Sequence, residues 1–233
     1  MGFDTYYFGI FLMIPVLLLS LIVQARLKAT YFKFSRIGNG KRMTGAQIAS
    51  EILRNANITD VQIGCVSGQM SDHYDPVNKT LNLSEEVYTG ESVAAIGIAA
   101  HECGHAIQHA EGYAPVRLRS AIVGLTNFSS KLLYFLIIGS AFLSYSAGNA
   151  VGTTLFNLAV LCYLVLFLFQ MITLPVEFNA SARAINRIRS MGFSDEAVNG
   201  TKKVLSAAAM TYVASAVTVL WQLLIMMNRS KRR

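Results

Sequence analysis

The sequence predicts a mainly α-helical integral membrane protein with a small polar portion of mixed helix and strand. Three observations predict this class. Hydrophobic residues make up 53% of the 233 residues and charged residues only 14%, which is too apolar for an ordinary soluble domain. Several uncharged runs are long enough to cross a hydrocarbon core of about 30 Å. The segments 26–131 and 175–203 hold most of the charged residues and turn signals.

The first apolar run covers residues 5–23 and contains no charge. Asp4 precedes this run, and Arg26 and Lys28 follow it. A secretory signal peptide carries basic residues ahead of its apolar stretch, so the order found here favours a retained helix. We therefore expect an N-terminal transmembrane anchor over residues 1–25.

Two further apolar runs lie close together in the second half of the chain, at residues 132–147 and 153–174. A short uncharged loop at residues 148–152 separates them. Both runs are long and apolar enough to enter a bilayer, and the connection leaves room only for a tight reversal. We expect a transmembrane hairpin over residues 132–174.

A fourth uncharged run covers residues 204–227. Its first half consists of small or weakly polar residues, and such a helix packs against protein more readily than against lipid. The segment 204–233 is therefore predicted as a hydrophobic helix followed by a basic tail. Four full crossings would put this tail on the same side as the N-terminus, so its side of the membrane stays open.

The net charge of +7 comes from basic residues whose positions along the chain indicate the membrane topology. Lys and Arg gather beside the apolar runs, at residues 26–42, 117–131 and 183–203, and form no patch interleaved with aromatic residues. This arrangement argues against nucleic acid and for a lipid bilayer as partner. The positive-inside rule places both large polar segments in the cytoplasm and the N-terminus outside.

The polar portion begins with one helix and one strand. Thr44 is suited to an N-cap, and the apolar spacing after it predicts an amphipathic helix over residues 43–58. Residues 60–66 are predicted as a short strand. Two polar segments further on, 71–79 and 80–84, read as a turn and a half-exposed strand, with Asp72 and Asp75 as turn-forming residues.

A helix of about 18 residues is expected after Ser92, because the next proline or turn cluster comes only after Gly112. After the hairpin, Pro175 is suited to the start of a helix and Gly192 to its end. This second helix lies in the predicted cytoplasmic segment 175–203 and contains Glu177, a candidate metal ligand.

The motif HECGHAIQH at residues 101–109 predicts a metal site. His101 and His105 are one helical turn apart, so both imidazoles can bind one ion at about 2.1 Å. Glu102 projects toward the edge of that face, where it can act as a general base without coordinating. These polar groups would be costly to bury in an apolar helix without an ion or hydrogen bonds. We expect Zn²⁺ as the cofactor.

A third protein ligand has to come from another segment. His109 lies about 12 Å from His101 along the helix axis, too far for one zinc ion, and is better explained as a polar residue at the helix end. Glu177 follows the predicted hairpin and can return to the two histidines. Spacing alone does not distinguish this ligand from an acid placed favourably at a helix start.

Four motifs in order resemble one family: SDHYDP (71–76), AAHECGHAIQHA (99–110), LPVEFNASARA (174–184) and AAAMTYVASA (207–216). They are similar to the neutral zinc metallopeptidases of the YugP type, which are bacterial membrane proteins. More distantly, the chain resembles the gluzincin group of HtpX and the CAAX prenyl proteases. The resemblance implies a zincin-like fold for the polar portion and a place in the bacterial plasma membrane.

The more distant resemblance implies that Glu177 completes the zinc site, as the glutamate of an EXXXD segment. The aspartate of that segment falls at Ser181, so its supporting role is either lost or taken by Asn179. The resemblance also implies that the strand 80–84 is a sheet edge on which an extended substrate can pair.

Together these features predict a membrane-embedded zinc endopeptidase that acts at the cytoplasmic face on a protein or peptide substrate. His73 and Tyr74 are candidate donors to the developing oxyanion, against the alternative of an ordinary turn. Two other functions stay open. An intramembrane protease would need residues 92–110 to cross the bilayer, for which they are too short and polar. A non-catalytic zinc scaffold would need a fourth protein ligand. The oligomeric state is not predicted.

Overall fold

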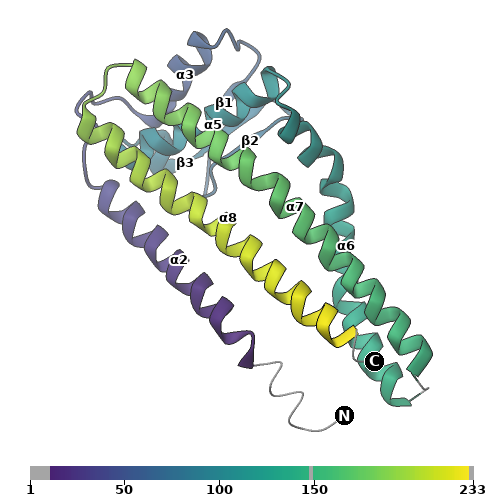
Figure 1. Ribbon diagram of the computed structural model, residues 1–233. Helices are drawn as coiled ribbons and strands as arrows, with labels where there is room; N and C mark the ends of the chain where they lie inside the picture. The colour runs from purple at the N-terminus through teal and green to yellow at the C-terminus, as the bar shows by residue number, and fades with distance from the viewer. Residues whose placement is uncertain (1–10, 147–148, 231–233) are drawn as a thin grey trace. The chain divides into compact units, whose positions relative to one another are not determined.

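The computed structural model describes residues 11–146 and 149–230 (Figure 1). It is mainly helical with one three-stranded sheet, which confirms that part of the predicted class. The elements are α2 (Ile14–Phe34), α3 (Gly45–Asn55), β1 (Gln62–Val66), β2 (His73–Asp75), β3 (Thr80–Ser84), α4 (Glu85–Tyr88), α5 (Val93–Ala110), α6 (Ala114–Ser146), α7 (Asn149–Ser190) and α8 (Asp195–Ser230).

Four helices, α2, α6, α7 and α8, are long and apolar enough to cross a membrane. Many of their large apolar side chains are exposed, as Phe135 and Phe142 on α6 illustrate with 75% and 69% of their surface accessible. Apolar surface on this scale is what a lipid environment accommodates. The described part of each predicted apolar run overlaps one of these helices; residues 5–10 of the first run and residue 147 of the second lie outside the described residues.

The helix start predicted at Pro175 is wrong, because α7 runs without a break from Asn149 through Pro175 to Ser190. A proline inside a helix costs one backbone hydrogen bond and a local kink. Two new helix ends would leave several more backbone groups to satisfy. The expected loop at 148–152 is likewise helical from Asn149 onward. The predicted helix end is confirmed by Gly192, whose φ is 72°.

The chain divides into two compact units, and the first consists of Met1–Ile22, Leu118–Leu174 and Tyr212–Arg233. Within this unit the indole of Trp221 on α8 donates a hydrogen bond to the carbonyl of Leu12 at 2.6 Å. Its small core joins α6, α7 and α8 through buried side chains: Leu133, Leu136, Phe156, Ala159, Cys162 and Met226.

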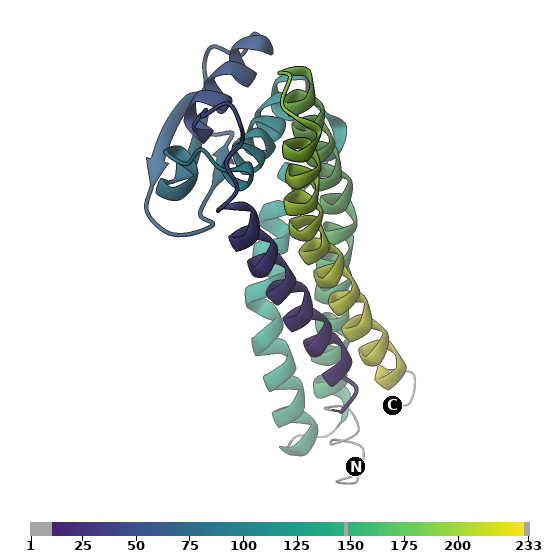
Figure 2. The same ribbon diagram turned by 90° about the vertical axis from the view of Figure 1, so that its left-hand side faces the viewer.

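The second unit, Val23–Arg117 and Pro175–Thr211, contains the sheet and the histidine motif. Its core is built around α5, which contacts α3, and Figure 2 shows the strands beside these helices. Thr44 caps α3 as predicted and forms a reciprocal capping box with Gln47. The largest buried side chains come from α3, β3 and α5, each at most 1% exposed: Ile48, Ile52, Leu81, Leu83 and Ile96.

The sheet has the order β1-β3-β2, with β1 parallel and β2 antiparallel to β3. The strand 80–84 is therefore central, and the expectation of a sheet edge there is wrong. Leu81 and Leu83 are fully buried, as suits a central strand packed on helices. The strand β2 was predicted as part of a turn, because three residues before Pro76 are too few to show an alternating pattern.

The cysteines allow a chemical test of the core of the second unit. Cys65 on β1 is exposed, whereas Cys103 on α5 is buried and its thiol faces the carbonyl of Ala49 at 3.7 Å. Burial, with the charge of Glu102 adding to it, raises the pKa of the Cys103 thiol. We expect iodoacetamide to modify Cys65 in the folded chain and Cys103 only after denaturation. Peptide mass spectrometry measures both, and equal labelling of the two would contradict this core.

Candidate metal centre

Helix α5 presents two histidines of the motif, His101 and His105, on one face. Its N-cap is Ser92, whose hydroxyl accepts a hydrogen bond from the backbone N–H of Ala95 at 3.1 Å, and its 18 residues match the prediction. The ring centroids of His101 and His105 are 4.7 Å apart, with the ring planes at 84°. Both rings are mostly buried, with 15% of each side chain exposed. The helix thus holds two imidazoles side by side.

Helix α7 brings Glu177 to this pair. One carboxylate oxygen, Oε2, lies 3.3 Å from Nε2 of His101 and 3.6 Å from Nε2 of His105. Glu177 is buried, and one donor atom from each of the three residues lies within 4.8 Å of the other two. The sequence predicted this triplet, and the structure brings its members together. His109 is not part of the group.

The two helices approach closely because small residues meet between them. A Cβ atom on Gly104 would lie only 2.7 Å from the carbonyl oxygen of Ala180 on α7. Ala180 and Ala184 are themselves fully buried. Glu177 precedes Ala180 by three residues, about one helical turn, and Gly104 is adjacent to His105. The contact between backbones therefore sets how near the carboxylate comes to the imidazoles.

Each imidazole is also contacted at its second nitrogen. Nδ1 of His105 lies 3.0 Å from Oε1 of Gln108, and Nδ1 of His101 lies 3.2 Å from the hydroxyl of Ser181. An imidazole that donates from Nδ1 presents the lone pair of Nε2 on its other side. In both rings Nε2 is the nitrogen that faces Glu177, which is the orientation that metal binding requires.

Gln108 is a supporting residue that sequence reasoning missed. It is fully buried, and its amide nitrogen donates to the carbonyl of Val176 at 2.9 Å and to Asn179 at 3.0 Å. The amide therefore links His105 on α5 to the backbone next to Glu177 on α7. Its position three residues after His105 on the same helix was the signal available in the sequence.

The sequence left two possibilities for the supporting contact at position 181: either it is lost, or Asn179 provides it. The structure agrees with neither. Ser181 itself contacts His101, so the contact is not lost. Asn179 contacts Gln108 and accepts a hydrogen bond from Arg183 at 2.7 Å, so it reaches the histidines only through Gln108. A hydroxyl can occupy this place because it needs only one acceptor lone pair for the imidazole N–H.

Glu102 lies beside the group without joining it. It is 8% exposed, and its Oε2 accepts a hydrogen bond from the backbone N–H of Tyr74 on β2 at 3.0 Å. Burial lowers the pKa of His105, but its contacts with Glu177 and the nearby charge of Glu102 outweigh burial, so the pKa is raised. The carboxylates of Glu177 and Glu102 therefore favour positive charge at His105.

The side chains of His73 and Tyr74, the predicted oxyanion donors, contact residues other than the three candidate metal ligands. The ring nitrogens of His73 lie 2.8 Å from the carbonyl of Ser71 and 3.1 Å from the amide nitrogen of Asn82. The ring of Tyr74 packs against His109, with centroids 5.6 Å apart. Tyr74 approaches Glu102 through its backbone N–H, which donates a hydrogen bond to the carboxylate.

The two aspartates of this segment do different things. Asp75 forms the predicted turn, since its carboxylate accepts from the backbone N–H groups of Val77 and Asn78 at 2.8 and 3.2 Å. Asp72 does not form a turn as predicted. It accepts from the backbone N–H and hydroxyl of Ser84 at 2.7 and 3.0 Å, and burial raises its pKa. Asp72 thereby fixes the segment before β2 to the end of β3.

The donor set fits zinc. Two imidazoles and one carboxylate are a common three-residue set for a zinc ion that keeps an open fourth position. The Nε2 atoms converge on a buried carboxylate, and the Nδ1 atoms are held by neutral partners. His101, His105 and Glu177 are therefore the residues that would hold the metal.

Replacing Gln108 with leucine tests the support of His105. We expect zinc affinity to fall about 10- to 100-fold, because the imidazole loses its fixed orientation and α7 loses two hydrogen bonds. Competition titration of the purified full chain with a zinc-binding dye measures the affinity. The same change at exposed Gln62 on β1 is the control and should leave it unchanged. Unaltered zinc binding in Gln108→Leu would show that the contact at 3.0 Å does not orient the ligand.

Comparison with known proteins identifies the class of this chain. Residues 9–231 match the family described as "Putative neutral zinc metallopeptidase", and the chain belongs to this family. It is similar to a protein of Bacillus subtilis (strain 168) named "Putative membrane protease YugP", with 44% identity over 216 residues, which cover 92% of this chain and 93% of that protein. No solved structure matches. The predicted resemblance to the YugP-type zinc metallopeptidases is thereby confirmed.

Proposed function

We propose that this chain is a membrane-embedded zinc metalloendopeptidase of gluzincin type, which cleaves protein or peptide substrates at the cytoplasmic face of a bacterial plasma membrane. One observation carries the proposal. Two imidazole nitrogens and a buried carboxylate converge within 4.8 Å, and a second carboxylate, Glu102, lies beside them. Membership of a zinc metallopeptidase family supports the same reaction class.

The metal ligands are His101, His105 and Glu177. A bound zinc ion lowers the pKa of a water molecule toward about 7 and polarises a carbonyl group. Structural zinc sites have four protein ligands, whereas the group contains three among the His, Cys, Asp and Glu residues that the structure describes. The donor count therefore favours catalysis over a scaffold.

Glu102 is the general base. Its carboxylate takes a proton from the attacking water and gives a proton to the leaving amine, which completes the hydrolysis. The backbone N–H of Tyr74 holds one of its oxygens, so the base is oriented by the sheet before any substrate arrives. His73 and Tyr74 stay as predicted oxyanion donors. For His73 this role requires release from Ser71 and Asn82 when substrate binds.

An extended substrate is expected to lie along β2. The strand β3 has a neighbour on each side, whereas β2 is at an edge of the sheet and reaches Glu102 through Tyr74. An edge strand presents backbone groups that an extended peptide can pair with. The strand β2 thus takes the place that the sequence suggested for residues 80–84.

Cleavage at the cytoplasmic face is favoured over cleavage inside the bilayer. The motif helix α5 is not among the four helices that could cross a membrane. Helix α7 has 42 residues, about twice the length a bilayer core needs, so its second half with Glu177 can extend beyond the hydrocarbon. The positive-inside pattern supports a cytoplasmic position for this half.

Metal removal and replacement test the proposed function. We expect the purified full chain in detergent to hold one zinc ion, measured by inductively coupled plasma mass spectrometry, and to cleave unfolded casein. A chelator should abolish cleavage, and one equivalent of zinc should restore it. Cleavage that survives complete removal of zinc would refute the proposal. Zinc could instead be bound without any cleavage, and cobalt substitution could give a spectrum typical of four protein ligands and no water. That result would support the non-catalytic zinc scaffold.

A further inference from the structure

A groove separate from the metal ligands lies between α2 and α8 in the second unit. Its volume is about 790 Å³, and residues 23–34 of α2 and 199–210 of α8 line it. The lining positions recur every three or four residues on each helix, so one face of α2 and one face of α8 form the two walls. Both stretches belong to the same compact unit.

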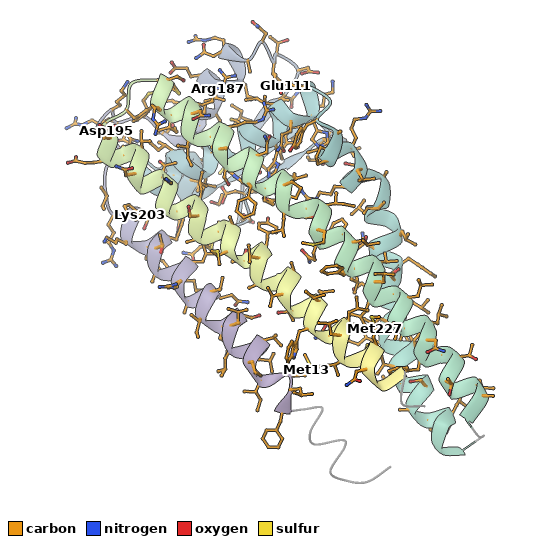
Figure 3. The ribbon with its side chains drawn as sticks, viewed as in Figure 1. Met13, Glu111, Arg187, Asp195, Lys203 and Met227 are labelled. Carbon is orange, nitrogen blue, oxygen red and sulfur yellow. The ribbon has the colours of Figure 1, made fainter. Side chains whose placement is uncertain are left out.

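One end of the groove is strongly basic. Arg26 and Lys33 line it from α2, and Lys202 and Lys203 line it from α8. Figure 3 labels Lys203 on α8. None of the described lining residues is acidic, and these four cations form no ion pair with any described residue. Four uncompensated like charges around one groove repel one another, and a bound anion relieves that repulsion.

The polar lining suits phosphate oxygens. Thr30 on α2, and Ser206 and Asn199 on α8, contribute hydroxyl and amide groups to the same groove. Hydroxyl and amide N–H groups donate hydrogen bonds to phosphate, and Arg and Lys add charge-assisted bonds. A phosphate group can therefore be both neutralised and hydrogen-bonded between the two walls.

The other end of the groove is apolar. Val23 on α2, and Ala207 and Met210 on α8, line it there. The apolar run of α2 ends at residue 23, and the uncharged run of α8 begins at residue 204. The groove thus runs from basic side chains to apolar side chains, on two helices that could cross a membrane. A ligand that matches both ends is an amphiphile with an anionic head.

Close packing holds the walls together at the basic end. Phe34 of α2 packs on Gly200 of α8, where a Cβ atom would lie 2.9 Å from its ring carbon Cε1. The ammonium of Lys33 lies 5.7 Å from the centroid of the same ring. The glycine allows the two helices to meet, and the groove opens beside this contact.

From these features we propose that the groove binds one anionic phospholipid. Its phosphate lies among Arg26, Lys33, Lys202 and Lys203, and one acyl chain follows Val23 and Met210 toward the hydrocarbon. The apolar end favours a lipid over free phosphate or a polar phosphate ester, which would leave that surface exposed. This site is independent of the proposed peptidase chemistry.

The test compares lipid binding by matched variants of the full chain in neutral detergent. Native mass spectrometry measures retention of phosphatidylglycerol against phosphatidylcholine with the same acyl chains. We expect wild type to bind one phosphatidylglycerol preferentially and Arg26→Gln/Lys33→Gln to bind it about tenfold or more weakly. Lys28→Gln/Arg36→Gln removes two exposed charges of the same region outside the groove and is expected to bind as wild type does.

Three results would overturn the proposal. Equal weakening in both variants would indicate only a general attraction between charges and lipid. Equal retention of the two lipids by wild type would show that the groove has no anionic preference. Displacement of phosphatidylglycerol by millimolar glycerol 3-phosphate would identify a site for soluble phosphate esters. Lys202→Gln/Lys203→Gln provides a second variant from the other wall, and circular dichroism verifies that each variant is folded.

Discussion

Glu102→Gln is expected to lower the rate of peptide hydrolysis about 10²- to 10⁴-fold while zinc stays bound. The amide has the size of the carboxylate, and its oxygen can still accept the hydrogen bond from the N–H of Tyr74. It cannot take a proton from water at neutral pH. The base is therefore removed while the fold and the three ligands are kept. Initial rates on a quenched fluorescent peptide and zinc content per chain measure the two effects separately.

Two other glutamates make this experiment specific. Glu111→Gln alters an exposed residue just after the same helix, paired with Arg183 at 2.6 Å, and should leave the rate within about twofold because surface pairs contribute little. Glu177→Gln should lose both activity and zinc, since the buried ligand is changed. If Glu102→Gln kept its activity, the general-base assignment would fail. If it lost zinc, Glu102 would be a ligand.

The grouping of the candidate metal ligands could be predicted from the sequence because local geometry determines most of their arrangement. A helix places residues four positions apart on one face, so His101 and His105 had to converge once α5 formed. The N-cap at Ser92 and the break at Gly112 made that helix recognisable. Glu177 needed more than spacing, because the resemblance to a known family selected it over the alternative of a helix-start acid.

The contacts that complete the site depend on packing that no local pattern encodes. The order of the strands follows from pairing between distant segments, so the central place of residues 80–84 was not visible. The continuation of α7 through Pro175 depends on the balance between one lost hydrogen bond and two new helix ends. Gln108 and Ser181 have ordinary positions in the sequence, and their role appears only when α5 and α7 lie together.

That approach of α5 and α7 can be tested at one glycine. In a helix, changing glycine to alanine should stabilise by about 0.5–1 kcal/mol when the new methyl group meets open space. At Gly104 the methyl carbon would instead lie 2.7 Å from the Ala180 carbonyl oxygen. Backbone atoms cannot turn aside as a flexible side chain can, so α7 must shift away from α5. We expect Gly104→Ala to destabilise the chain by about 1–3 kcal/mol.

The same shift moves Glu177 away from the two histidines, so zinc affinity should fall together with stability. Gly124→Ala on α6 is the matched control, since a Cβ atom there has nothing within 4 Å. Thermal unfolding of both variants in detergent, with and without zinc, separates the effects. The wild-type chain and the control should gain stability when zinc is added, and Gly104→Ala should gain much less. A Gly104→Ala chain that is stabilised by zinc as strongly as the control would mean that this contact does not position the third ligand.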